Sequence, residues 1–238
     1  MAEREVETTK TPPEGSVLEP PAIPVLEEAG RQLRAPWAAS IAGLLFSVLF
    51  TAALVLLRSQ PDEAELVRQF EGGQAQAIVI GGLYLAPFAG IMFLWFVAVI
   101  RDQIGEREDR FFATVFFGSG LLFVALLFTA AAVASTPTTL VEFLGQTPLS
   151  AEGVSLLRAL AYTLLFAFAT RGAAVFMLAA ATIGVKSGVF PRWFALTGYL
   201  LGFVLLVAVG FWDWIILVLP AWVAVVSLFI LRRERARR

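Results

Sequence analysis

Arg171 is a single basic residue inside a long apolar run, about 12 to 14 residues from either end. A charge at such a depth in a membrane costs about 2.5–3.5 kcal/mol on insertion scales, so it needs hydrogen-bond acceptors or an anion. Small neighbours at helical spacing, Ala167 and Ala174, indicate that this stripe packs against other helices. Two interpretations follow: a structural bridge between helices, or a site for an anion or a polar lipid headgroup.

Pro87, in a preceding apolar run, offers Arg171 an acceptor. A proline has no N–H, which leaves the carbonyl of Leu83 free one turn before it. If both runs cross the membrane in the same direction, Leu83 and the Arg171 guanidinium are expected at similar depth. The hydroxyls of Tyr84 and Tyr162 are further candidate acceptors. We therefore predict one buried polar site, structural or ligand-binding, formed by these five residues.

A second polar cluster is the turn from residue 101 to 110, in which seven of ten residues are charged. Its acids lie among arginines and do not have the spacing of a calcium-binding loop, so no metal site is predicted. The simplest interpretation is a solvated turn that fixes membrane topology. The alternative is an interaction site, and its candidate residues are Arg101, Asp102, Glu106, Arg107, Asp109 and Arg110.

Histidine and cysteine are both missing from the chain. Without them there is no imidazole for haem or zinc, no thiolate ligand and no thiol redox chemistry. Most intramembrane enzymes need such groups or paired acids at depth, and no acid lies inside an apolar run. We therefore predict no catalytic site, no cofactor and no metal.

The elements that position these residues are six apolar runs, in a chain that is 58% apolar with a mean hydropathy of +0.79. Each run has roughly the 17–25 residues that cross about 30 Å of hydrocarbon. The predicted fold is an all-α polytopic membrane bundle of six helices, spanning residues 36–231. The runs are Pro36–Leu57, Ala75–Ile100, Phe111–Ala134, Ala159–Val185, Trp193–Gly210 and Trp214–Leu231.

The ends of the chain set the predicted orientation. Residues 1–35 contain seven Glu and five Pro without an apolar core, which predicts a disordered cytoplasmic segment. Residues 232–238 form a basic tail, a topology anchor at anionic lipid and too short for nucleic-acid binding. With both termini inside, 14 of the 18 basic residues are cytoplasmic, as the positive-inside rule requires.

Small and capping residues predict details of the bundle. A ladder of Ala39, Gly43, Ser47 and Thr51, and the pair Gly198 and Gly202, are typical of helix contacts within the chain, with dimerisation as the alternative. Thr136 is expected to begin a separate short helix that ends at Gly145. Ser150 is expected to cap an extension of the fourth run.

Three segments resemble uncharacterised multi-helix membrane proteins that are common in actinobacteria. They are Thr170–Leu178, the joint Gly188–Tyr199 with its Pro191-Arg192-Trp193, and the charged turn running into Phe111–Thr114. The likeness covers the predicted second to fifth helices. It implies a multi-pass protein of a bacterial inner membrane and implies no mechanism, because such families have no assigned activity.

These observations favour a non-enzymatic bundle of the bacterial cytoplasmic membrane that has a structural role or binds lipids or a partner protein. A homo-oligomer is compatible with them. The alternative is a small transporter or channel in which Arg171 meets an anionic substrate. Few polar residues in the runs, and no membrane acids for ion coupling, count against transport.

Overall fold

The computed structural model describes residues 36–58, 79–104, 110–188, 190–207 and 214–235. Two compact units divide the chain between Gln32 and Leu33, and all of the described residues belong to the second unit. The predicted disordered segment 1–35 therefore lies outside the described residues. Within the described ranges the secondary structure is helical and contains no strand, which confirms the all-α class.

Several helices join end to end. The π-helix η1 continues into α5, α7 continues through the π-helix η3 into α8, and the short 3₁₀ turn η4 leads into α10. In chain order the elements are α2 (Pro36–Arg58), η1 (Val79–Leu85), α5 (Ala86–Ile104), α6 (Arg110–Glu142), α7 (Ala151–Tyr162), η3 (Thr163–Ala169), α8 (Thr170–Lys186), α9 (Arg192–Val207), η4 (Ile215–Leu217) and α10 (Val218–Arg235).

Five helical stretches among the described residues are long and apolar enough to cross a membrane. They are Trp37–Leu57, Ile80–Arg101, Phe111–Glu142, Ala151–Lys186 and Ile215–Arg233. The fifth predicted run appears as α9, an apolar helix of 16 residues that is shorter than the other five. The chain is therefore a multi-pass membrane protein by the length and composition of its helices.

Two predictions concern the end of the third predicted run and the start of the fourth, and the structure bears out one of them. The expected separate helix after Thr136 is wrong, because α6 continues through Pro137 to Glu142. Thr136 Oγ1 donates back to the Ala132 carbonyl at 2.9 Å instead of capping a new helix. The prediction for Ser150 is confirmed: its side chain accepts a hydrogen bond from the Gly153 amide at 3.2 Å and caps α7.

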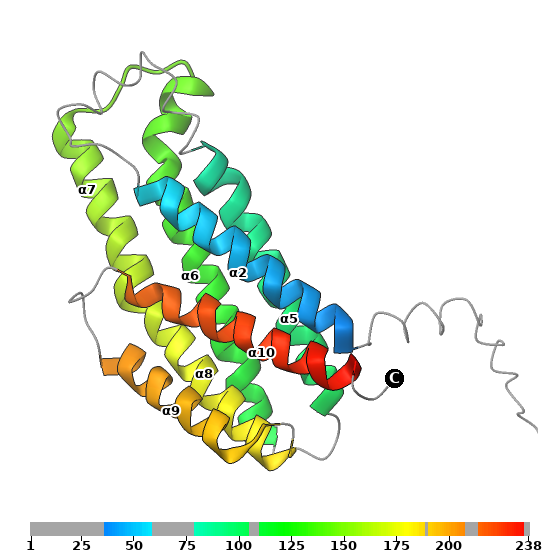
Figure 1. Cartoon of the computed structure of the whole chain (residues 1–238). Helices are drawn as coiled ribbons and strands as arrows, with labels where there is room; N and C mark the ends of the chain where they lie inside the picture. The colour runs from blue at the N-terminus through cyan, green and yellow to red at the C-terminus, as the bar shows by residue number, and fades with distance from the viewer. Residues whose placement is uncertain (1–35, 59–78, 105–109, 189, 208–213, 236–238) are drawn as a thin grey trace, which may run out of the picture. The chain divides into compact units, whose positions relative to one another are not determined.

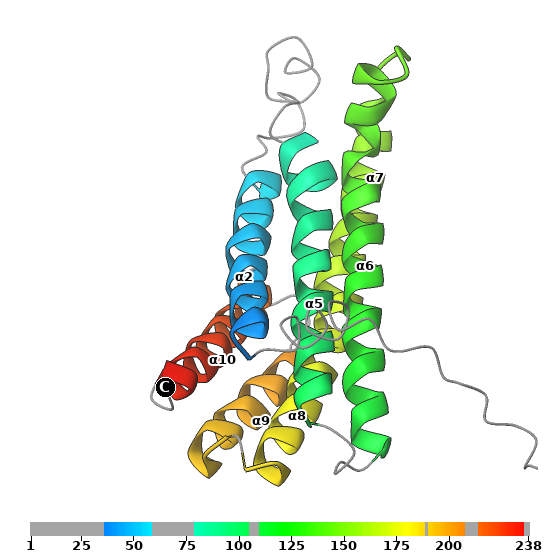
Figure 2. The same ribbon diagram turned by 90° about the vertical axis from the view of Figure 1, so that its right-hand side faces the viewer.

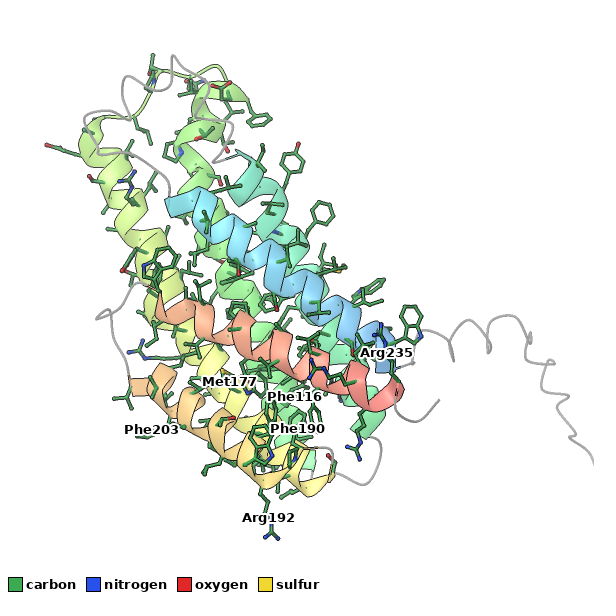
Figure 3. The ribbon with its side chains drawn as sticks, viewed as in Figure 1. Phe116, Met177, Phe190, Arg192, Phe203 and Arg235 are labelled. Carbon is green, nitrogen blue, oxygen red and sulfur yellow. The ribbon has the colours of Figure 1, made fainter. Side chains whose placement is uncertain are left out.

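Neighbouring helices pack in a fixed order. Helix α2 lies between α5 and α10, α6 lies against α5 and α8, and α9 packs on α8 (Figures 1 and 2). The starts of α2, α6 and α9 and the ends of α5, α8 and α10 lie together at one end of this bundle. We call this the basic end, since its described cations are Arg101, Lys186, Arg192, Arg232, Arg233 and Arg235. Figure 3 marks Arg192 and Arg235 there.

The core of the bundle is a cluster of buried phenylalanines contributed by four helices. Phe93 on α5 is at its centre, with ring centroids 4.7 Å from Phe46, 5.2 Å from Phe123 and 4.9 Å from Phe176. Such tilted and edge-on pairs add about 0.5–1.5 kcal/mol each beyond area burial. The phenylalanine cluster comprises Phe46, Phe50, Phe93, Phe96, Phe116, Phe123 and Phe176, all essentially buried.

The small residues lie at helix contacts within the chain, as predicted. Ser47 Oγ donates to the Pro220 carbonyl of α10 at 2.8 Å, and a Cβ on Gly43 would overlap Ser227 of the same helix. On α9, Gly198 and Gly202 face α8, where a Cβ on Gly202 would lie 3.2 Å from the Ala174 carbonyl. These positions let the helix backbones approach closely, so the interpretation as intramolecular packing is confirmed.

The joint between α8 and α9 is closed by a glycine and an aromatic ring. Gly188 has a φ of 67°, a left-handed conformation that favours glycine after a helix end. The Phe190 amide donates to the Gly184 carbonyl at 2.9 Å, and its ring covers Gly184 so closely that a Cβ there would overlap it. The same ring packs edge-on against Phe194 of α9, with centroids 5.0 Å apart. This geometry fixes the antiparallel pairing of α8 and α9.

Candidate functional site

Arg171 lies one residue after the point where a π-helix returns to an α-helix. In η3 the ladder is wider by one residue, and Thr170 Oγ1 donates to the Leu165 carbonyl, five residues back, at 3.1 Å. Short π segments inside α-helices occur frequently at functional sites, because the changed ladder leaves a carbonyl available to other donors. Arg171 Nη1 donates to the Ala167 carbonyl, so the guanidinium bonds within its own helix.

The side chain of Arg171 is half-buried and points back along its helix towards η3, because its acceptor lies four residues before it. This direction agrees with the general tilt of helical side chains towards the N-terminus. The guanidinium is thereby directed away from the basic end, where α8 ends at Lys186.

Two faces of α8 are close to neighbouring helices. Gly172 faces α6, where a Cβ would lie 3.3 Å from the backbone nitrogen of Phe123. Leu178 and Thr182 face α9: Leu178 contacts Gly202, and Thr182 Oγ1 accepts from the Tyr199 hydroxyl at 2.8 Å. Arg171 is seven residues before Leu178, two helical turns, and so lies on the α9-facing side.

The four expected partners of Arg171 are not gathered around it. Leu83 and Tyr84 are on η1, and Pro87 is on α5; this stretch packs against α2 and α6, whereas α8 packs against α6 and α9. Tyr84 is largely exposed, and Tyr162 on α7 stacks on the Phe166 ring at 4.2 Å.

We predicted a hydrogen bond from Arg171 to the Leu83 carbonyl. Among the described residues, Arg171 instead donates to the Ala167 carbonyl. Helix α6 packs against both η1 and α8, and these two elements do not pack extensively against each other. The sequence indicates that Leu83 and Arg171 lie at a similar depth in the membrane. It does not indicate which helices are adjacent in the bundle, and the contact between the two residues depends on that order.

The charged turn is described only at its two ends. Arg101, exposed at the end of α5, has its guanidinium 4.9 Å from the centroid of the Phe117 ring. Lys186 on α8 has its ammonium 4.2 Å from the Phe112 ring. Both rings belong to α6, so cation–π contacts of about 0.5–1 kcal/mol tie the basic end together. The side chains of the other interaction candidates, Asp102, Glu106, Arg107, Asp109 and Arg110, lie outside the described residues.

Three contacts that sequence patterns did not reveal involve buried polar atoms without a hydrogen-bond partner. Ser227 Oγ faces Gly43, Ser135 Oγ faces Gly82, and Trp222 Nε1 faces Gly198, each on a neighbouring helix. A hydroxyl oxygen against a glycine Cα can accept a weak C–H hydrogen bond, which partly offsets its burial. These pairs are helix contacts, and only a three-dimensional packing could reveal them.

Among the described residues, no group of three His, Cys, Asp or Glu side chains is placed to hold a metal ion. Comparisons with protein-family models, with curated protein sequences and with solved structures find no match to this chain. The resemblance to actinobacterial membrane proteins therefore stays a prediction, and the functional argument rests on the helices themselves.

Proposed function

We propose that this chain is a non-enzymatic helix bundle of a bacterial cytoplasmic membrane, with a structural or lipid-binding role. The observation that carries the proposal is the phenylalanine cluster, which fills the space between α2, α5, α6 and α8. A transporter or an intramembrane enzyme needs polar groups that converge inside the bundle. The buried polar residues among those described are serines and threonines, and none of them is charged.

The proposed topology has six crossings with both termini in the cytoplasm. The gathering of cations at the basic end supports this orientation, because positively charged residues are retained on the cytoplasmic side. The other cations with described side chains, Arg158 on α7 and Arg171, are directed towards the opposite end. Helix α9 is the sixth crossing: its 16 residues rise about 24 Å, and interfacial residues complete the span.

Exposed apolar stripes support lipid contact around the bundle. On α9 the side chains of Leu196, Leu200 and Phe203 are each at least 60% exposed and recur at helical spacing. Figure 3 shows Phe203 pointing away from the other helices. In water such a stripe would be an association surface, whereas in a bilayer it faces the acyl chains.

An anion-flux assay distinguishes this bundle from a small anion transporter. Proteoliposomes loaded with chloride, with valinomycin and potassium to carry the counter-charge, are expected to release chloride no faster than liposomes without protein. The reason is the apolar phenylalanine cluster, which offers an anion no hydrated path. A protein-dependent flux that disappears in Arg171→Leu, and persists in the matched variant Arg158→Leu, would overturn the proposal in favour of transport through the Arg171 region.

A further inference from the structure

Arg171 has more hydrogen-bond donors than its described surroundings use. A guanidinium carries five N–H donors, and the acceptor for Arg171 among the described residues is the Ala167 carbonyl. The acidic residues within the described helices, Asp102, Glu142, Glu152 and Glu234, all lie near helix ends far along the chain from it. An unpaired charge in hydrocarbon is costly, so the unused donors favour an anion or another polar group from outside the described residues.

The level of the guanidinium within the membrane follows from the length of α8. The 15 residues from Arg171 to Lys186 rise about 22 Å, and the bond to Ala167 places the guanidinium about 6 Å further from the basic end. With Lys186 at one edge of a hydrocarbon layer of about 30 Å, the guanidinium reaches the opposite edge. This is snorkelling, the movement of a long charged side chain towards the headgroups.

The side of the bundle on which the guanidinium emerges faces lipid. Phe168, one turn before Arg171, is 56% exposed, and Arg171 itself is half-buried. Helices α8 and α9 are antiparallel, and their register is set by contacts of Gly198 with Ala181 and of Gly202 with Ala174 and Leu178. This register brings Val207, at the end of α9, to the level of Arg171. Val207 is 61% exposed, so the described side chains leave this edge between α8 and α9 uncovered at the level of Arg171.

We infer that Arg171 binds the phosphate group of an anionic glycerophospholipid in the outer leaflet, at the edge between α8 and the end of α9. A phosphodiester accepts two parallel N–H bonds from a guanidinium, a geometry that a lysine ammonium does not reproduce. Phe168 and Val207 would lie beside the acyl chains of the same lipid. The inference deepens the proposed lipid-binding role and rests on the proposed orientation for the identity of the leaflet.

Native mass spectrometry of the purified full-length chain tests this site with phosphatidylglycerol as the probe. Arg171→Leu is expected to weaken phosphatidylglycerol binding at least about tenfold, the effect of losing hydrogen bonds to a charged group. Arg171→Lys is expected to be intermediate. The matched control is Arg158→Leu on the same helix, about 20 Å further from the basic end than Arg171 and therefore beyond the hydrocarbon; it is expected to leave binding unchanged.

Two controls accompany this experiment. Competition with inorganic phosphate identifies the source of the anion, and circular dichroism shows whether each variant is folded. Inorganic phosphate at millimolar concentration is expected not to displace the lipid; full displacement would assign the site to a free anion and overturn the lipid assignment. Circular dichroism checks each variant, and Arg171→Lys carries the test if Arg171→Leu does not fold. If every folded Arg171 variant, Arg171→Lys included, binds phosphatidylglycerol as well as the parent does, Arg171 is not the binding site. That result leaves the flux assay unaffected, so the two proposals fail separately.

Discussion

Replacing Phe93 with alanine is expected to lower the free energy of unfolding by about 3 kcal/mol, near the lower end of the range for Phe→Ala in protein cores. Phe93 is fully buried and contacts the rings of Phe46, Phe123 and Phe176. Alanine leaves a cavity at the centre of the phenylalanine cluster, and the surrounding rings lose dispersion contacts. The value is near the lower end because helices that separate in lipid remain in an apolar medium.

The matched control for Phe93→Ala is Phe203→Ala, the same change on α9 at a side chain that is 60% exposed. Its effect is expected to lie within about 0.5 kcal/mol of zero, because little packing is lost. Reversible unfolding in mixed micelles, followed by circular dichroism, measures both variants. Equal destabilisation of the two would contradict the placement of the phenylalanine cluster at the core.

Gly172→Leu is expected to be about as damaging, at about 3 kcal/mol, for the opposite reason of overpacking. A Cβ on Gly172 would already lie 3.3 Å from the backbone nitrogen of Phe123 and 3.5 Å from the Ser119 carbonyl. These are backbone atoms of α6 and cannot rotate away, so a leucine must push α8 and α6 apart. The contacts of Phe176 with the rings of Phe93 and Phe116 would then be lost.

Gly118→Leu provides the control for this substitution. Gly118 is an exposed glycine of α6, and a Cβ at this position would have no atom within 4 Å, so leucine would project into lipid without a clash. Its higher helix propensity favours the variant by a fraction of a kcal/mol. The same unfolding measurement applies, and a Gly172→Leu protein as stable as Gly118→Leu would rule out the close contact of α8 with α6.

Sequence patterns predict much of this fold because membrane helices are long and apolar. The start of α2 at Pro36, the cap at Ser150 and the glycine contacts of α2 and α9 follow from local residue types. Pro137 shows the limit of such reasoning. A proline removes one backbone donor, and the helix continues through it when the flanking turns supply the remaining bonds.

The candidate site is harder to predict than the fold. Arg171 is identified by its charge, but its acceptor is not, because the π-helix η3 has no proline or glycine to signal it. The residues Thr163–Ala169 read as an ordinary apolar helix. Which helices neighbour α8 depends on packing around the bundle, and one-dimensional periodicity gives depth without that order. Depth alone therefore assigns Leu83 and Tyr84 to Arg171, although η1 packs elsewhere.

The length of α7, η3 and α8 taken together changes the interpretation of Arg171. A run that begins near residue 159 places Arg171 at its middle, whereas the continuous helix extends from Ala151 to Lys186. With Lys186 placed at one edge of the hydrocarbon layer, the guanidinium would lie close to the other edge. The cost of burying the charge is lowest at that edge, which favours a lipid phosphate over a buried polar network.

The sidedness of single cysteines tests the proposed membrane topology most directly, and the chain contains no native cysteine to remove. Thr147→Cys, Ser187→Cys and Arg235→Cys replace exposed residues: the first lies between α6 and α7, the second follows α8, and the third ends α10. In intact cells a membrane-impermeant maleimide is predicted to label Thr147→Cys alone, and the other two only after lysis. Labelling of Arg235→Cys in intact cells would place the end of α10 outside, leave α9 on one side of the membrane, and contradict the six-crossing bundle.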